Sequence, residues 1–337
     1  MRFEFYTPEL ENVPKLSVDG TVPNSIHFSH WQGNETPAEL KADTSTEIAL
    51  NLVASPNQQQ LTHGIELVTN NHFDTDGVLS VWTMLKGERA LDLRDKFVPA
   101  AESGDFSEFR NESAVRASIV IQGTDQPVPD DDPGSPIASR LAGEVVENEA
   151  RAYELVLPEV ERILTHTDDY EELWRGPWRR IERALDTFER GTSSVTEFPD
   201  LSLVFLAPEA FGDSGFIPGG HSIPFTAIAH HAKGPLFLIT TPVSNGYAYR
   251  IDYPYYSWAE TVVRPRIRRR DLSDNLAQLN QSEKSGQGEW TFDTTELTAA
   301  IKFLADDGKL AGSTIRPDEV AAVLQTSARA EPAAASV

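Results

Sequence analysis

A chain of 337 residues, 39% of them hydrophobic and including 16 Phe, 8 Tyr and 6 Trp, is long enough for two globular domains, and its composition excludes a disordered chain. It has no cysteine, which excludes disulfides, thiolate metal sites and cysteine nucleophiles and favours a reducing compartment. The net charge of −23 argues against binding of extended nucleic acid, because that binding depends on lysine and arginine.

The N-terminus, MRFEFYTPELENVPKL, lacks the apolar core of a signal peptide. Nowhere does an apolar run approach the ~20 residues that a membrane span requires. We therefore predict a soluble, cytoplasmic protein without a membrane partner.

The first half of the chain is predicted to alternate strands and helices. Units of strand, loop and helix build parallel sheets, and ligands bind at the carboxyl ends of such strands. We therefore predict an α/β fold with a mainly parallel sheet flanked by helices. The predicted strands cover residues 25–29, 64–69 and 117–122, and the predicted helices follow the capping residues Thr44–Glu47 and cover residues 78–85.

A helical segment over residues 140–190, broken near Asp168 and at Gly176–Pro177, is predicted to complete the first domain, and the second half is predicted to have a sheet of its own. Asn245–Gly246 is a turn signal between its last two strands. The strand candidates cover residues 201–206, 236–240 and 247–252. The predicted domains are a metal-binding domain over residues 1–190, a smaller α/β substrate-binding domain over 191–325, and a disordered tail over 326–337.

The segment HFDTDG carries the most informative polar residues. His72, Asp74 and Asp76 alternate, so an extended backbone would point all three side chains the same way. One imidazole and two carboxylates suit a divalent metal, for which we favour Mn²⁺ over Mg²⁺, Fe²⁺ or Zn²⁺. The alternative is a polar loop that caps the helix at Val78, with Asp76 near its positive end.

The segment Asn71–Ser80 (NHFDTDGVLS) resembles the first motif of the DHH phosphoesterase superfamily, in which a histidine and two aspartates after the first strand bind a pair of divalent ions. Pro218-Gly219-Gly220-His221 is similar to the glycine-rich stretch with histidine in the C-terminal substrate domain of that superfamily. The resemblance implies a hydrolase of phosphoesters.

The chain departs from this pattern because the name-giving Asp-His-His triplet is absent between residues 90 and 200. Asp105 in SGDF and Asp125 are candidates for the isolated second aspartate, and a helix cap or turn is the alternative for both. Over the whole chain, especially in SHWQGNETP, ADTSTEIALN and YPYYSWAE, the sequence also resembles an uncharacterised family whose domain has no known function.

Two further groups of residues are candidates for substrate binding. Gly220 would let the backbone approach an anion closely, and His221 behind it is predicted to act in catalysis together with Asp76. Arginines follow aromatic residues in YPYYSWAETVVRPRIRRR, where Arg264 and Arg266 would bind an anionic group and Tyr255 would stack on a base. Surface ion pairs are the alternative for these arginines. His30 could join the metal site or be a buried structural histidine.

The leading hypothesis is a metal-dependent hydrolase that acts on a phosphoester or a related small anionic substrate, with a homodimer left open. The phosphate loop, the GxGxxG fingerprint, the GxSxG elbow and the HExxH motif are all absent. A mononuclear non-haem iron oxygenase that uses His72, Asp74 and a later histidine is the enzymatic alternative. A protein that binds an anion or a partner chain without turnover is the third.

Overall fold

The computed structural model describes residues 1–124, 134–293 and 298–326. The chain forms two compact units that are interleaved in sequence. Unit 1 comprises residues 1–179 and 255–266, and unit 2 comprises residues 180–254 and the chain from residue 267 onward. A short segment of the second half therefore belongs to unit 1, which a division at residue 190 does not anticipate. Asp125 and nearly all of the predicted tail lie outside the described residues.

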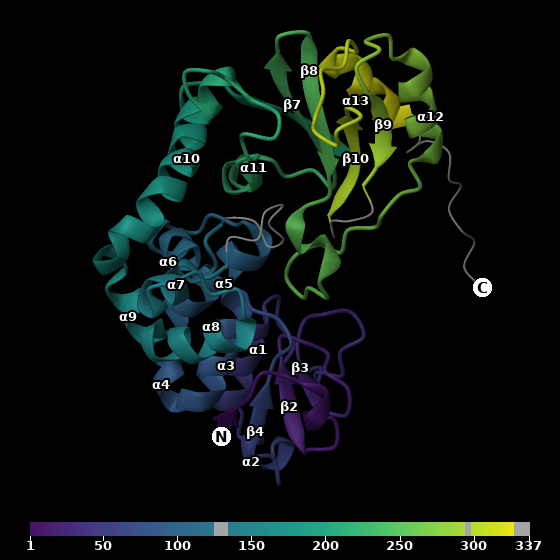
Figure 1. Ribbon diagram of the computed structural model, residues 1–337. Coiled ribbons are helices and arrows are strands. Elements are labelled where there is room, and N and C mark those ends of the chain that lie inside the picture. Colours follow the sequence, from purple (N-terminus) through teal and green to yellow (C-terminus); the bar gives the residue numbers. More distant parts are fainter. Residues whose placement is uncertain (125–133, 294–297, 327–337) are drawn as a thin grey trace, which may run out of the picture. The chain divides into compact units, whose positions relative to one another are not determined.

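Unit 1 is built on a four-stranded sheet whose strands run in the order β1-β4-β2-β3, every neighbouring pair being parallel. Figure 1 shows these short strands in purple and blue beside helices α1 and α3. The predicted α/β fold with a mainly parallel sheet is confirmed. The strands are β1 (Arg2–Phe3), β2 (Lys15–Val18), β3 (Ile26–Phe28) and β4 (Leu67–Thr69).

Helices cover this sheet in two layers. Helices α1 and α3 pack on the strands, α5 packs on both of them, and α6 packs on α5. The predicted start of α1 is confirmed, since the Thr44 hydroxyl caps it by accepting a hydrogen bond from the backbone N–H of Glu47 at 3.2 Å. The helices of unit 1 are α1 (Ser45–Ala54), α2 (Gln58–Leu61), α3 (Thr75–Lys86), α4 (Glu88–Leu91), α5 (Arg94–Phe106), α6 (Glu112–Gln122), α7 (Pro136–Ala142), α8 (Glu149–Val156) and α9 (Val160–Thr165), followed by α10 (Glu171–Glu189), which continues into unit 2.

Two local predictions are wrong. The run ASIVIQ, predicted as a strand over residues 117–122, is the last part of helix α6, which Asn111 caps and Gly123 ends with φ of 83°. A short apolar run fits a buried strand and a buried helix equally well. The predicted break at Gly176–Pro177 is also absent, since helix α10 runs through both residues. Pro177 lacks a backbone N–H and so removes the hydrogen bond to the carbonyl four residues earlier, but the rest of the helix continues.

Unit 2 contains a mixed sheet with the strand order β5-β6-β7-β8-β10-β9, in which β6 and β7 are parallel and the other neighbouring pairs of described strands are antiparallel. The predicted hairpin is present, because β7 and β8 pair antiparallel up to Val243 and Gly246. The buried core of this unit includes Tyr249, Trp290 and Phe303. The elements are β5 (Ser194–Phe198), β6 (Leu201–Phe205), α11 (Phe225–His231), β7 (Phe237–Val243), β8 (Gly246–Asp252), α12 (Ser273–Ser282), β9 (Glu289–Phe292), β10 (Ala299–Leu304) and α13 (Pro317–Thr326).

Candidate metal centre

Four polar side chains follow the carboxyl ends of neighbouring strands in unit 1. Asp19 comes directly after β2, and His30 follows β3 by two residues. His72 and Asp74 follow β4, which lies next to β2 in the sheet. Because the strands are parallel, these ends meet at one edge of the sheet, where α/β proteins bind their ligands.

Two helices bring further carboxylates to the same edge. Asp76 lies in the first turn of α3, and its two oxygens accept hydrogen bonds from the backbone N–H groups of Ser45 and Thr46, both at 2.7 Å. Asp105 lies near the end of α5 and is buried. The first turn of α1 therefore fixes the Asp76 carboxylate, as the positive end of a helix stabilises an anion.

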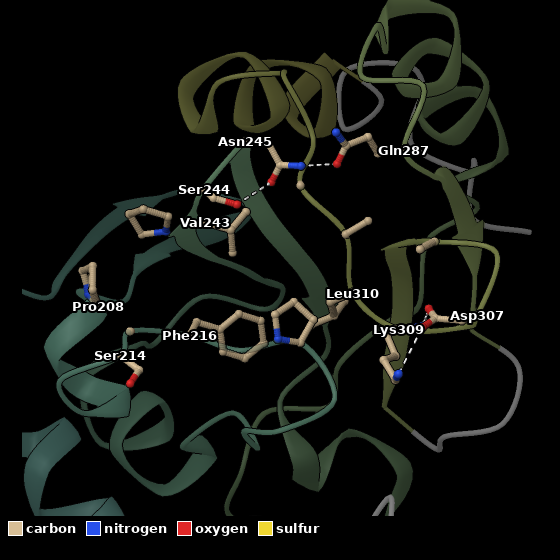
Figure 2. A pocket seen from close by; sticks show the side chains of 16 residues that line it. Pro208, Ser214, Phe216, Val243, Ser244, Asn245, Gln287, Asp307, Lys309 and Leu310 are labelled. Atoms are coloured by element: carbon tan, nitrogen blue, oxygen red, sulfur yellow. Dashed lines mark hydrogen bonds and ion pairs between the residues drawn. The ribbon is translucent and has the colours of Figure 1, made fainter.

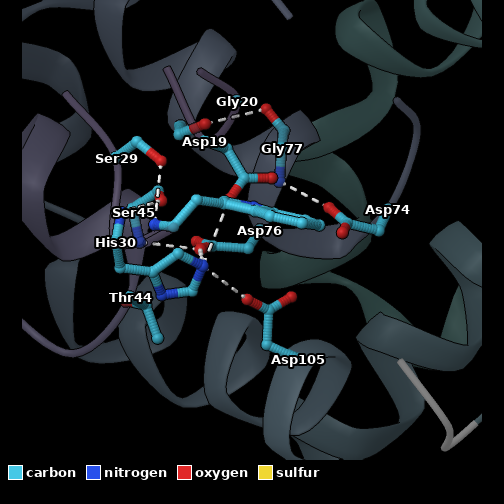
Figure 3. Close-up of polar contacts among 12 residues, drawn as sticks. Asp19, Gly20, Ser29, His30, Thr44, Ser45, Asp74, Asp76, Gly77 and Asp105 are labelled. Carbon is cyan, nitrogen blue, oxygen red and sulfur yellow. Dashed lines mark hydrogen bonds and ion pairs between the residues drawn. The ribbon is translucent and has the colours of Figure 1, made fainter. Parts of the chain in front are cut away.

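These residues form two adjoining groups. In the first, His30 Nε2 lies 3.1 Å from Asp105 Oδ2, 3.4 Å from Asp19 Oδ1 and 3.7 Å from Asp76 Oδ2. In the second, His72 Nε2 lies 2.9 Å from Asp19 Oδ2 and 3.3 Å from Asp74 Oδ2. The side chains of His30, Asp76 and Asp105 point toward one another in Figure 3. Asp19 belongs to both groups and presents one oxygen to each histidine.

The ligand atoms of these groups are buried without the hydrogen bonds that buried polar atoms normally make. Within the described part of the chain, both oxygens of Asp19, the Nε2 atoms of His30 and His72, and Oδ2 of Asp105 have no hydrogen-bond partner. Such orphaned atoms are costly in a folded protein and call for an explanation. One cation in each of the two groups would satisfy these five atoms, and a mixed set of imidazole and carboxylate donors suits a divalent metal.

The opposite ends of several of these side chains are firmly held. His30 Nδ1 lies 2.7 Å from the backbone carbonyl oxygen of Asp43, so that Nδ1 is the donor and Nε2 faces the carboxylates. Burial opposes protonation of His30, but the contacts with Asp105 and Asp19 outweigh it and raise the His30 pKa, so a bound cation would displace the proton on Nε2. Asp74 caps α3, because its Oδ1 accepts from the backbone N–H of Gly77 at 2.7 Å. The Asp74 carboxylate therefore caps the helix with one oxygen and faces His72 with the other.

The backbone is adapted to the site at two positions. Asp19 adopts φ of 61°, a left-handed conformation that is uncommon for a residue other than glycine. Strain of this kind concentrates at functional sites. A Cβ at Gly77 would stand 2.5 Å from Asn70 Nδ2, 2.6 Å from the Tyr153 hydroxyl and 3.1 Å from Asp19 Oδ2. Only glycine lets α3 begin this close to the site.

The pKa values of the buried aspartates are shifted in different directions: those of Asp76 and Asp105 are raised, and that of Asp19 is lowered. Burial raises the pKa of Asp76 to about 7, and the neighbouring charge of Asp19 adds to this effect. Burial also raises the pKa of Asp105. Burial opposes ionisation of Asp19 as well, but the charge of His72 and the close contacts with both histidines outweigh it and lower the Asp19 pKa. Several acids that repel one another at this short range form a site that a divalent cation would stabilise.

The residues predicted from the HFDTDG segment all lie at this edge, but not as one set of three. His72 and Asp74 belong to the second group and Asp76 to the first, together with Asp105. The predicted alternation is wrong because helix α3 begins at Thr75, so that Asp76 is helical and not extended. The capping proposed as the alternative is also present, since Asp74 is the N-cap of α3.

The predicted substrate residues in the arginine-rich segment are placed differently from the expectation. Tyr255 is buried, which removes its ring from contact with a base in solvent. Arg264 is ion-paired with three carboxylates, those of Asp43, Glu102 and Glu108, at 2.6 to 2.7 Å. Its guanidinium group is therefore already occupied by acids of unit 1, in keeping with the ion-pair alternative. Arg266 is exposed.

The other predicted substrate residues, Gly220 and His221, belong to unit 2. The His221 ring stacks near that of Phe211, with the ring centroids 5.9 Å apart, and its Nδ1 accepts from the backbone N–H of Ile217 at 3.1 Å. A pocket of about 740 Å³ lies in the same unit, and its lining does not include either residue (Figure 2). Among the residues that line it are Pro208, Phe216, Asn245, Gln287 and Lys309.

Sequence reasoning missed Asp19 and underrated His30. Asp19 precedes Gly20 directly after the run Lys15–Val18, and an Asp-Gly pair at the end of a strand is a signal that could have identified it. For His30 the sequence leaves two alternatives, a metal ligand and a buried structural histidine. It is indeed buried, but its Nε2 faces three carboxylates.

The fold and the site together define a two-unit α/β protein whose parallel sheet carries, at its carboxyl edge, a buried cluster of aspartates and histidines able to hold a metal ion. The chain belongs to the family described as "Family of unknown function (DUF6687)", which it matches over residues 1–336. No curated protein matches the sequence. Among the described helices, none combines the length and the apolar character needed to cross a bilayer.

One solved structure that the chain is similar to is described as a pGpG-specific phosphodiesterase, PggH, from Vibrio cholerae. The two chains are 12% identical, the match covers 96% of this chain and 90% of that chain, and the TM-score is 0.34. A likeness of this size carries no argument about function.

Proposed function

We propose that this protein is a metal-dependent hydrolase of a phosphoester or a related small anionic substrate, with divalent cations, Mn²⁺ foremost, held by the two groups of ligands. The observation that carries the proposal is the convergence of five buried ligand atoms without hydrogen-bond partners within the described chain. Asp19, His30, Asp76 and Asp105 would hold one ion, and Asp19, His72 and Asp74 the other.

The shared carboxylate of Asp19 supports a site for two ions. Its Oδ1 faces His30 and its Oδ2 faces His72, so the two groups adjoin without overlapping. Pairs of divalent ions lower the pKa of bound water and stabilise the charge of phosphoryl oxygens, as in many phosphatases and nucleases. The carboxylates of Asp19, Asp74, Asp76 and Asp105 would hold such a pair and offset its charge.

The oxygenase alternative is less well supported. Each group contains one histidine and at least two carboxylates, in place of the two histidines and one carboxylate of the iron oxygenases. The sheet that carries the site is parallel. His221 and Gly220 in unit 2 stay proposed contacts for the substrate, whereas Arg264 is withdrawn from that role because acids already bind it.

Elemental analysis of the purified full-length chain is the first test, followed by a screen of phosphomonoesters and phosphodiesters with Mn²⁺ present. We expect bound divalent metal and turnover of at least one phosphoester. Asp74→Asn is the informative variant, since its remaining side-chain oxygen can still cap α3 while the charged ligand is lost. A chain that binds metal but turns over no phosphoester would instead support a protein that binds anions without catalysis.

A further inference from the structure

A segment from the second half of the sequence lies against the first group of ligands. Residues 255–266, here called the strap, belong to unit 1 although the chain on both sides of them belongs to unit 2. The ring of Trp258, itself 9% exposed, meets the ring of His30 edge-on, with the centroids 4.9 Å apart. The backbone N–H of Glu260 donates to the carbonyl oxygen of His30 at 2.7 Å. The strap therefore contacts both the ring and the backbone of this histidine.

Asp43 joins the strap to His30 through two different groups. Its backbone carbonyl oxygen lies 2.7 Å from His30 Nδ1 and so fixes the orientation of the ring. Its carboxylate accepts hydrogen bonds from the backbone N–H groups of Val262, Val263 and Arg264, and from the Arg264 guanidinium at 2.7 Å. A displacement of the strap would therefore move the residue that orients His30.

Arg264 extends this connection to the helix that carries Asp105. Its Nη2 donates to Glu102 at 2.7 Å and to Glu108 at 2.6 Å, and its Nε donates to Glu108 at 2.7 Å. Glu102 and Asp105 lie three residues apart in α5 and thus about one turn from each other. The same guanidinium also donates to the carboxylate of Asp43. Asp43 lies two residues before Ser45, whose backbone N–H binds the Asp76 carboxylate.

We infer that the strap is a working part of the metal centre and that Arg264 is a positioning residue, which keeps the α1 and α5 walls of the first ligand group at the spacing a cation requires. The inference rests on the proposed function only in that the site must bind a divalent cation. According to this inference, Arg264 of the arginine-rich segment supports the metal centre and does not bind the substrate.

The charges around Arg264 explain why an arginine is needed. Three carboxylates share this one guanidinium, whose planar fork can serve several acceptors at once. Burial opposes the charge of Arg264, but the hydrogen bonds and charge of Glu108 and Glu102 outweigh that cost and raise the Arg264 pKa. Without this cation, Asp43 and Glu102 would repel each other across the site and open the first group.

The test compares Mn²⁺ binding by the full-length wild type, Arg264→Met and the matched control Arg266→Met, measured by calorimetry. Residues that orient metal ligands typically contribute 10–100-fold to affinity. We expect Arg264→Met to weaken the binding of one Mn²⁺ by about 10–100-fold and to leave the second, held with His72 and Asp74, less affected. Arg266 is exposed, so its variant should bind like the wild type.

Because Arg264→Met removes a cation that three acids share and could prevent folding, a milder variant is needed. Glu260 anchors the middle of the strap by accepting from Lys41 and Asn34, both at 2.9 Å, in a partly exposed position. Glu260→Ala should fold and loosen the strap without leaving a buried charge. We expect it to weaken Mn²⁺ binding by about twofold to fivefold, the range of a partly exposed ion pair.

Hydrogen exchange of the wild type supplies a measurement that needs no variant. Coupling between sites is reciprocal, so if the strap supports cation binding, Mn²⁺ must slow exchange of the strap amides, notably those of Glu260 and Val263, by about fivefold or more. Equal affinities in the wild type, Arg264→Met and Glu260→Ala, or unchanged exchange of those amides on saturation with Mn²⁺, would overturn the inference alone. A wild type that binds no cation would overturn the proposed function as well.

Discussion

In unit 2 the carboxylate of Glu283 accepts hydrogen bonds from the hydroxyls of Ser313 and Thr314 and from the backbone N–H groups of Ser285 and Thr314. In unit 1, by contrast, neither oxygen of the buried Asp19 accepts a hydrogen bond within the described chain. The first acid joins a loop to the end of a helix. The second faces other acids and two histidines. A carboxylate saturated with donors stabilises the fold, and a carboxylate deprived of them indicates a ligand.

The sharpest way to break this comparison is to remove the charge of Asp19. Asparagine tolerates the left-handed backbone of this position, so Asp19→Asn should fold. We expect loss of Mn²⁺ affinity greater than the ~10–100-fold caused by loss of an outer partner, because Asp19 serves both groups. The metal-free variant should lose stability in urea, because the attraction to both histidines that lowers the Asp19 pKa is lost with the charge. Intact Mn²⁺ binding would contradict the metal centre.

The space at the start of α3 gives the next largest effect. Gly77→Ala would place a methyl group within 2.5 Å of Asn70 and 2.6 Å of the Tyr153 hydroxyl, which donates to the carbonyl oxygen of His72 at 3.0 Å. We expect a loss of about 1–3 kcal/mol in the free energy of unfolding, as for other overpacked sites, and weaker Mn²⁺ binding.

Gly176→Ala is the matched control. This glycine also lies in a helix, α10, but nothing stands within 4 Å of the position of its added Cβ. We expect a change within about 1 kcal/mol in the free energy of unfolding, because the usual ~0.5–1 kcal/mol advantage of alanine inside a helix is offset by the contact of its Cβ with the ring of the following Pro177. Chemical unfolding of both variants checks the pair, and equal effects would show that Gly77 has no special role.

The next prediction concerns the pH dependence of Mn²⁺ binding, which depends on the protonation of Asp76. Asp76 has its pKa raised to about 7, chiefly by burial, so it holds a proton below that pH in the metal-free protein. A cation must displace that proton. We expect Mn²⁺ affinity to rise by about tenfold per pH unit between pH 5 and 7 and to level off above it. Calorimetry in buffers of different ionisation enthalpy would detect the released proton, and affinity independent of pH would count against Asp76 as a ligand.

The smallest expected effect is on the free energy of unfolding and comes from Glu283 in unit 2. Burial raises the pKa of Glu283, but hydrogen bonds, that of Ser313 first, outweigh it and lower the pKa to about 2. A lowered carboxyl pKa stabilises the fold above the unfolded-state value and loses this contribution as the pH falls toward 2. Glu283→Gln should cost about 1 kcal/mol at pH 7, less near pH 2, and leave Mn²⁺ affinity unchanged. Unfolding curves at the two pH values test this.

Local patterns in the sequence were enough to predict the parallel sheet, the Thr44 cap and the hairpin at Asn245–Gly246, because each depends on neighbouring residues. The HFDTDG segment pointed to His72, Asp74 and Asp76 as one polar group, and the structure places all three at the same edge of the sheet. How the ligands divide between two groups could not be predicted. That division depends on Asp19, which comes from another strand, and on the hydrogen bonds that fix Asp76 to α1.

The location of Arg264 was out of reach for a different reason. Its partners Asp43, Glu102 and Glu108 are more than 150 residues away in the chain, and no periodicity connects segments so distant. An arginine-rich run in an acidic chain predicts attraction to anions but cannot distinguish a substrate from the acids of the protein itself.

The crossing of the chain between its two units has a consequence for how the protein can be divided. Peptide bonds join the units after residues 179, 254 and 266, so no single cut releases either unit whole. A fragment that stops at residue 179 would lack Trp258 and Arg264, and its hydrophobic wall beside His30 would be open to water. Synthesis of the first unit is therefore complete only after more than half of the second has left the ribosome, which couples the maturation of the two.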